Sequence, residues 1–544
     1  MVIIGSYLHA PASFQIELSA PSETFTEFAP MDGNLILLLW NSNTAYPGFS
    51  LLGVNVAFSI AGKLTLLLDK DVTLGFFGLV VSAYSIGVVL SAPMMGYWSN
   101  QIKQTRLPII SGLVVNIIGN VMVVFVQSLP RHKTWMLLAA RFISGVGAGS
   151  QGPIQACVAM ASTHEEKNVA MALLAATISL GTVAGPGIQA AFVPLGYPGI
   201  DLPPFLHFNM YTGPAFMNIL LCLILILSFR FFFTESQVDL RDGSDRQGVQ
   251  EVLPFDRVAA ADCIWVRFLM LFCLEYVISI GTPYSMAMFG WNKSTAVFYV
   301  SILFTICGLM DFAGNILVGT FALRCMKERS TILFGVAFLI VTFLITFAWP
   351  GPPNAASAHL ISNTSDMLQT NFSLYATPTS PTLNISNSES VDDEGTGCNY
   401  SWCTYTPRTA VWQYVTGALM TVVAFSFAYS PSTILYSKVV GPRRQGTMQG
   451  IHAAVGGLAT STSPIVVSLL FSKYGPRVAW AAAIVLVVVT VIILLATYKR
   501  LIPYAEMVKN RTGRNIYEVE QREDSLVLLQ NVDERTSLLS YNRR

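Results

Sequence analysis

Long apolar segments of the length that crosses a lipid bilayer recur along this chain and constrain its fold more than any other feature. A transmembrane helix needs roughly 20 mostly apolar residues. Eleven segments meet that requirement, at about 76–98, 107–127, 134–160, 168–193, 211–233, 264–290, 295–322, 331–349, 410–437, 448–472 and 477–498. Because hydrocarbon cannot pair with backbone polar groups, each segment predicts a membrane-spanning α-helix.

The charge content supports a membrane protein and excludes several other classes. Only 12% of the 544 residues are charged, whereas a soluble domain carries about 25%. The net charge of +1 provides no basic field for nucleic acid, so we expect no nucleic-acid partner. The eight cysteines show no metal-ligand spacing, and no nucleotide-binding loop or catalytic triad is present. We therefore expect no cofactor, no metal site and no enzymatic activity.

A weaker apolar segment at about 48–68, interrupted by Lys63, completes a set of twelve spans. A polar stretch after the ninth span holds four N-glycosylation acceptors, which predicts that it faces the lumen or the outside: Asn363, Asn371, Asn384 and Asn399. Short loops rich in basic residues, such as the one with Lys103 and Arg106, mark the cytosolic side. These constraints agree, with both termini cytosolic, only if twelve spans are counted.

Two internal alignments indicate a duplicated architecture. A shift of 223 residues superimposes Gly96 on Gly319, Arg106 on Arg329 and Gly112 on Gly335. A shift of 278 superimposes five pairs, among them Ala175 on Ala453 and Pro186 on Pro464. The offsets differ by 55, close to the length of the loop with the four acceptors, so one insertion explains both. Two six-helix halves related in this way are typical of transporters whose substrate site lies between the halves.

The predicted fold is therefore an all-α membrane protein with 12 transmembrane helices in two six-helix halves. A charged cytosolic joint separates the halves, and the tail carries no periodic apolar face. The predicted parts are an N-terminal segment at 1–47, a first bundle at 48–233, the joint at 234–263, a second bundle at 264–499 with a lumenal loop at 350–408, and a cytosolic tail at 500–544.

Three local motifs resemble the major facilitator superfamily. Gly96 to Asn100, with Arg106 following, resembles the signature loop between spans two and three, although Asn100 stands where the family has an acid. Arg141 followed by a stripe of small residues resembles the motif of span four. The antiporter motif of span five is similar to a segment containing Gly181, Gly185 and Pro186.

Motifs of the second half resemble a lysosomal branch of the same superfamily. They include Glu275 with Thr282-Pro283, Asp311 after Gly308, and Gly475-Pro476 before Trp480. This resemblance covers about 74–505 and implies an endolysosomal membrane protein linked to chloride permeation and organellar ion balance.

Three charged residues lie within predicted spans, where a charge is costly unless it faces a cavity or a partner. Arg141 in span four could hold an anion or brace the first bundle. Glu275 in span seven could take part in a proton-coupled step or stabilise packing as a neutral acid. Asp311 in span eight, with Asn315 one turn on, could line the same cavity or form a polar contact between spans. His452, at the start of span eleven, is interpreted as an interfacial polar residue rather than a proton relay.

Two further features concern the loop and the tail. Cys398 and Cys403 share the predicted lumenal face, and we expect them to form a disulfide. The tail contains an acidic dileucine pattern, in which Glu534 precedes Leu538 and Leu539, and which predicts recognition by clathrin-adaptor proteins.

The sequence thus favours transport of a small solute or anion, with chloride and protons as candidate ions, across the lysosomal or endosomal membrane. Alternating access and a chloride-permeable channel are both open. A membrane scaffold or sensor on a transporter fold is the third reading, because a fold alone does not determine activity.

Overall fold

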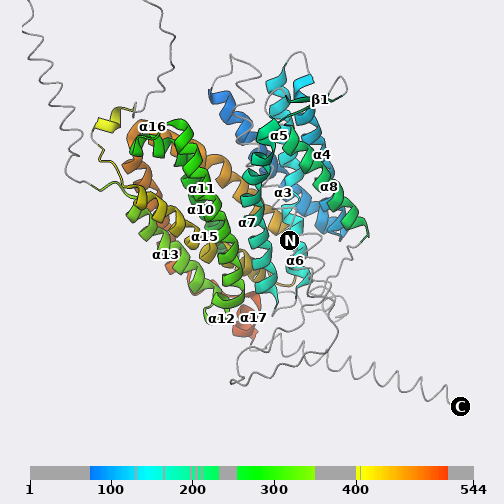
Figure 1. The fold of residues 1–544 in the computed structure, drawn as a ribbon. Helices are drawn as coiled ribbons and strands as arrows, with labels where there is room; N and C mark the ends of the chain where they lie inside the picture. The colour runs from blue at the N-terminus through cyan, green and yellow to red at the C-terminus, as the bar shows by residue number, and fades with distance from the viewer. Residues whose placement is uncertain are drawn as a thin grey trace, which may run out of the picture.

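The computed structural model describes residues 74–128, 132–162, 166–195, 199–202, 206–209, 212–231, 254–349, 400–404 and 406–512. The weak first span at 48–68, most of the joint, the four glycosylation acceptors and the dileucine pattern lie outside these residues. Within them the chain is almost entirely helical, and the helices form two bundles side by side (Figure 1).

The first bundle contains the predicted spans two to six. Its main helices are α3 (Leu74–Ile102), α4 (Arg106–Phe125), α5 (Lys133–Ala148), α6 (Gln151–Ala161), α7 (Lys167–Phe192) and α8 (Gly213–Phe231). Two residues separate α5 from α6, so these two helices together make up span four. Short 3₁₀ turns follow α4 at Val126–Ser128 and α7 at Val193–Leu195. The all-α prediction missed a small antiparallel pair, β1 (Ile200–Leu202) and β2 (Leu206–Phe208), between α7 and α8.

The second bundle contains spans seven to twelve. Its helices are α10 (Arg257–Phe289), α11 (Lys293–Leu317), η5 (Val318–Ala322), α12 (Leu323–Cys325), α13 (Glu328–Thr346), η6 (Ser401–Thr404), α15 (Val411–Val440), α16 (Gly446–Thr497) and α17 (Tyr504–Thr512). Local sequence sets several ends. Asp256 caps α10 by accepting the backbone N–H of Val258 at 2.9 Å, and Gly290 ends this helix at φ 67°.

The long helix α16 is a hairpin of two spans. Its backbone leaves the helical region at Gly475, where φ is 85° and ψ is 179°. The contacts with α10 show the reversal. The first arm runs along α10 in the same direction, since Gly456 lies beside Arg267 and Ser463 bonds to Phe272. In the second arm, by contrast, Ala479 bonds to Tyr276 and Thr490 bonds to Trp265, which lies earlier in α10.

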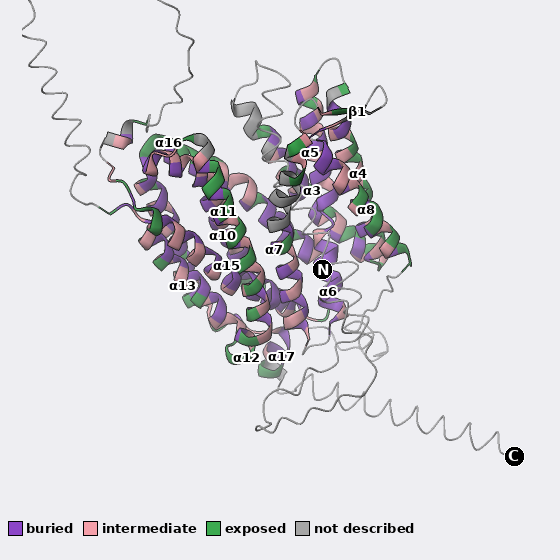
Figure 2. Ribbon diagram, in the orientation of Figure 1, coloured by how far each residue is buried: buried purple, intermediate pink, exposed green. Residues whose placement is uncertain are grey.

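The outer surface of the described helices fits a lipid environment. Seven of them are long and apolar enough to cross a membrane, α16 being one of the seven. Large apolar side chains are exposed along the outer faces of α8 and α11, among them Leu227, Phe231, Phe298 and Leu317 (Figure 2). In water such a surface would be unfavourable, whereas a bilayer solvates it.

The internal repeat has a structural counterpart where the two bundles meet. Gly96 on α3 lies so close to Gly446 of α16 that any side chain would collide with its carbonyl. Its repeat mate Gly319 packs in the same way against Ala172 and Asn168 of α7. Because Asn168 and Gly446 differ by 278 residues, the two contacts follow the second sequence offset. The duplication read from the sequence is thus also present in the packing.

The contact between the two bundles begins at the end that carries the basic loops and extends as far as the middle of the helices. We call this the basic end, and the opposite end, with the Gly475 turn, the sequon end. Along α3 and α16, Asn100 meets Gly446, Ala92 meets Gly450, and Ser85 lies 3.3 Å from Thr460. The two bundles diverge toward the sequon end (Figure 1). The structure is therefore closed at its basic end.

Candidate functional site

Asn100 of the signature loop joins the two halves at the basic end. Its side-chain oxygen accepts the backbone N–H of Gly446 at 3.0 Å, which satisfies an unpaired donor at the start of α16. Its amide donates to the hydroxyl of Thr447 at 2.8 Å and to the carbonyl of Arg444 at 3.3 Å. An uncharged amide therefore caps the start of α16.

The other residues of that motif act on packing. Gly96 allows the close approach of α3 to α16 described above. Arg106 donates to the carbonyl of Arg230 at the end of α8, at 2.9 Å, where a cation suits the helix terminus.

Arg141 lies on α5 and is 6% exposed, with its guanidinium 5.1 Å from the centre of the Tyr84 ring. The small residues that follow Arg141 allow α3 and α4 to pack closely against α5. A side chain at Gly145 would collide with the backbone of Tyr84, and one at Gly147 would collide with Gly112. This stripe is therefore a packing device within the first half.

The span-five motif is carried by an unbroken helix, because α7 includes Gly181, Gly185 and Pro186. Gly181 is buried, and the side-chain environment of the other two lies outside the described residues.

Asp311 forms the main polar contact between the halves at the middle of the bundle. It lies on α11 in the second half, and one carboxylate oxygen accepts the hydroxyl of Ser179 on α7 in the first half. The other oxygen accepts the hydroxyl of Ser426 on α15 at 2.7 Å and the amide of Asn315 at 3.0 Å. The amide of Asn315 also lies 3.2 Å from the Ser179 hydroxyl. One carboxylate thus holds three helices from both halves.

Glu275 is half-buried and lies near the middle of α10 (Arg257–Phe289). It makes no hydrogen bond or ion pair with the residues that the structure describes. Since the partners of Asp311 are Ser179, Ser426 and Asn315, neither Glu275 nor Arg141 is bonded to it. The three charged residues singled out in the sequence therefore do not form one bonded cluster.

Sequence reasoning missed Arg267 and misplaced His452. Arg267 stands near the predicted start of span seven, where a basic residue is expected to reach the membrane surface, yet it is 1% exposed. His452 was expected at an interface, but it is fully buried. The two contact each other inside the second half, with Arg267 Nη1 3.2 Å from His452 Nδ1. The hydroxyl partners of Asp311 were also missed, because serines that bond to their own helix are common and give no pattern.

Cys403 is disulfide-bonded, whereas six other cysteines are free: Cys157, Cys222, Cys263, Cys273, Cys307 and Cys325. Cys398 lies outside the described residues, so its pairing with Cys403 remains a prediction. No group of three metal-ligating side chains occurs in the described ranges.

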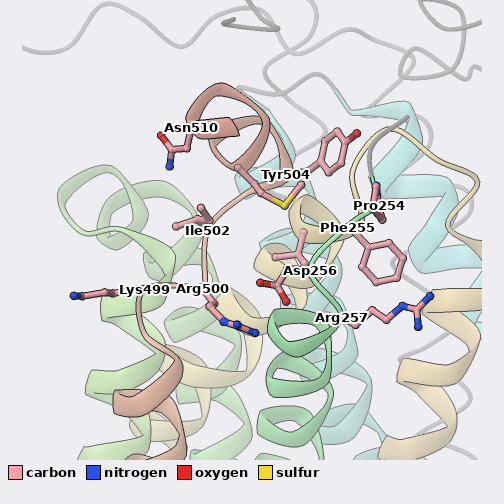
Figure 3. A pocket seen from close by; sticks show the side chains of 11 residues that line it. Pro254, Phe255, Asp256, Arg257, Lys499, Arg500, Ile502, Tyr504 and Asn510 are labelled. Atoms are coloured by element: carbon pink, nitrogen blue, oxygen red, sulfur yellow. The ribbon is translucent and has the colours of Figure 1, made fainter. Parts of the chain in front are cut away.

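A pocket of about 460 Å³ opens at the basic end, where the start of α10 faces α17 (Figure 3). Its charges are mixed, because Asp256 stands beside Arg257, Lys499 and Arg500. Figure 3 shows Lys499 pointing away from the other labelled side chains and Arg500 lying below Asp256. All elements around this pocket belong to the second half, so it is separate from the contact between the halves.

Comparison with known proteins agrees with this architecture. The family model of the Major Facilitator Superfamily matches residues 45–404. The major facilitator superfamily domain-containing protein 8 of Xenopus laevis is 29% identical over 452 residues, which cover 80% of this chain and 86% of that protein. The class D tetracycline resistance protein of Salmonella ordonez is 24% identical over 279 residues, or 50% of this chain and 65% of that protein.

Solved structures share the fold at low sequence identity. The proton:xylose symporter XylE superimposes with a TM-score of 0.60 at 11% identity, over 87% of this chain and 97% of XylE. The human organic anion transporter MFSD10 superimposes with a TM-score of 0.55 at 15% identity, over 85% of this chain and 98% of that protein.

Proposed function

This chain belongs to the major facilitator superfamily, and from that premise we propose that it moves a small solute or anion across the endolysosomal membrane by alternating access. The contact that carries the proposal is the bond between Ser179 and Asp311. It joins the first half, at the middle of α7, to α11 of the second half. Any motion that opens the basic end and separates α7 from α11 must break it.

Asp311 is the proposed proton-sensitive part of this contact. As a carboxylate it accepts bonds from Ser179, Ser426 and Asn315. Binding a proton turns one of its oxygens into a donor. At least one of the three bonds must then rearrange, so proton binding and the relative position of the halves are linked.

Glu275 is the proposed second proton-binding group. It lies within a span and has no bonded partner among the described residues, so a proton can bind it without breaking an existing ion pair. The two acids differ in what their protonation would change: Asp311 is bonded across the halves, whereas Glu275 is not. Arg141, buried in the first half, is the proposed residue that holds or attracts an anion.

The proposed endolysosomal location is supported by the resemblance of the motifs and by the tail, and the proposed chloride permeability is supported by the resemblance. The motifs of the second half resemble a lysosomal branch of the superfamily, and the acidic dileucine pattern at Leu538 and Leu539 suits adaptor recognition. The superposed human structure is named as an organic anion transporter, and at 15% identity its likeness to this chain shows the fold alone.

Electrical recording from enlarged lysosomes with ion substitution tests the proposal. Alternating access predicts saturable transport that Asp311→Asn alters. A large current that reverses at the chloride potential and is unaffected by Asp311→Asn would favour an open channel instead. Absence of both current and uptake, with the protein present in the same membranes, would contradict transport and favour a scaffold.

A further inference from the structure

An apolar cluster inside the first half contains one fully buried residue that belongs to the second half. The other buried members of this cluster in the described chain lie on α4, α6, α7 and α8, among them Leu113, Val158 and Met171. The exception is Ile434 of α15, whose side chain is 0% exposed. Leu323 of α12, also from the second half, is only partly buried against the cluster. Ile434 therefore inserts from one half into the packed interior of the other.

The position of Ile434 along α15 places this insertion near the basic end. It lies about two turns before Val440, the last residue of α15, and α15 passes beside α7 (Figure 1). Ala172, a cluster member in the first two turns of α7, also touches Gly319 across the interface. The hydroxyl partners of Asp311 on α7 and α15 both lie farther from the basic end. The insertion thus stands between the Asn100 contact and the Asp311 contact.

Ile434 holds the halves together without a charge or a hydrogen bond. Any motion that separates α15 from α7 at the basic end must withdraw its side chain from the cluster. Withdrawal exposes apolar surface on Ile434 and leaves an unfilled space among the first-half residues, and both effects oppose opening. Because an isoleucine does not titrate, its contribution to the closed state is the same at every pH. It therefore differs from the contribution of Asp311, which depends on proton binding.

We propose that Ile434 is the gate residue of the basic end: its side chain is an apolar plug that the second half inserts into the first when this end is closed. The plug sets a fixed resistance to opening, on which the proton-dependent contact at Asp311 acts. This inference deepens the proposed function, and it rests on that function only for the claim that the basic end opens during transport.

Distances across the basic end of the purified full-length protein test the plug without any measurement of transport. In lipid nanodiscs, one spin label is attached to the native Cys325, which is free and exposed at the end of α12. A second label is attached at Gln101→Cys, an exposed position near the end of α3 in the other half. Ile434→Ala should increase the ratio of long to short distances at least about tenfold, because truncating a packed isoleucine to alanine costs more than that in an equilibrium constant.

Leu435→Ala is the matched control for this variant. Leu435 is the next residue of α15, is 1% exposed and loses the same number of carbon atoms, but it packs in the second half's own cluster. It should leave the distances unchanged. Equal shifts in Ile434→Ala and Leu435→Ala, or no shift in either, would overturn the proposal.

A milder variant covers the case in which Ile434→Ala does not fold. Ile434→Val removes a single methylene group and should shift the distances in the same direction by about two- to tenfold; unchanged distances in this variant would also overturn the plug. The result separates the plug from the proposed function. A shift in a protein that transports no solute would support the plug and contradict the proposed function, whereas solute transport without any shift would contradict the plug alone.

Discussion

Removal of the Ser179 hydroxyl is expected to weaken the contact that holds α7 of the first half against α11 of the second half. Ser179→Ala deletes the only hydrogen bond that the described part of the first half makes with the Asp311 carboxylate. The bonds from Ser426 and Asn315 remain, so the carboxylate stays partly satisfied. A hydrogen bond to a charged group contributes about 1.5–3 kcal/mol. Since about 1.4 kcal/mol corresponds to a factor of ten, the state closed at the basic end should lose about 10- to 150-fold in population relative to the opposite state.

Distances between spin labels at the sequon end measure this shift. Trp135 at the start of α5 and Ser472 before the Gly475 turn are both exposed and belong to different halves. Cysteines at these positions carry the labels in a background where the exposed Cys325 is replaced by serine. Ser179→Ala should move the distance distribution toward shorter values as the sequon end closes.

Ser301→Ala is the matched control for this experiment. Ser301 lies on α11, as Asp311 does, but its hydroxyl bonds to the carbonyl of Val297 on its own helix and is exposed. It should leave the distances unchanged. If Ser179→Ala also leaves them unchanged, the contact does not stabilise the closed state and the reasoning is refuted.

Three further predictions follow from other parts of the chain. Gly475→Ala should lower the melting temperature and cost at least about 1–3 kcal/mol, because only glycine readily adopts its backbone conformation and a Cβ would lie 2.9 Å from the Trp402 ring; unchanged stability would contradict the hairpin geometry. The predicted glycosylation acceptors are Asn363, Asn371, Asn384 and Asn399. Replacing all four should reduce the protein to its enzymatically deglycosylated size on a gel, and an unchanged band would overturn the assigned topology. Leu538→Ala combined with Leu539→Ala should increase surface biotinylation, whereas unchanged biotinylation would show that the dileucine pattern does not direct sorting.

The broad fold could be predicted because the length of the apolar segments and the spacing of the internal repeat can both be read directly from the sequence. The hairpin at Gly475 illustrates this, since its two arms appear in the sequence as two spans of ordinary length separated by a Gly-Pro turn. The repeat predicted that Gly96 and Gly319 are equivalent, and their packing shows it. The pair β1 and β2 was missed because two strands of three residues are too short to show a period.

The polar contacts could be predicted only in part. Asp311 and Asn315 were associated because they lie one helical turn apart, and the structure joins them. Their partner Ser179 lies 132 residues away on another helix, and no periodicity within a helix encodes which face meets which neighbour. Arg267 was missed for a related reason: its position near the predicted start of a span suggests exposure, and only the packing of α15 and α16 over it makes it buried.

The pH dependence of transport by the purified protein tests the central claim most directly. The protein is reconstituted in liposomes, and anion flux is followed with an internal chloride-sensitive dye over a range of internal pH. Asp311→Asn and Glu275→Gln keep the size and shape of the side chains while removing their titration, and each amide carries a donor as the protonated acid does. If protons act through these acids, the wild-type flux varies with pH and at least one of the two variants loses that variation. Flux of normal size and normal pH dependence in both variants would contradict the account and leave Asp311 and Glu275 as packing residues.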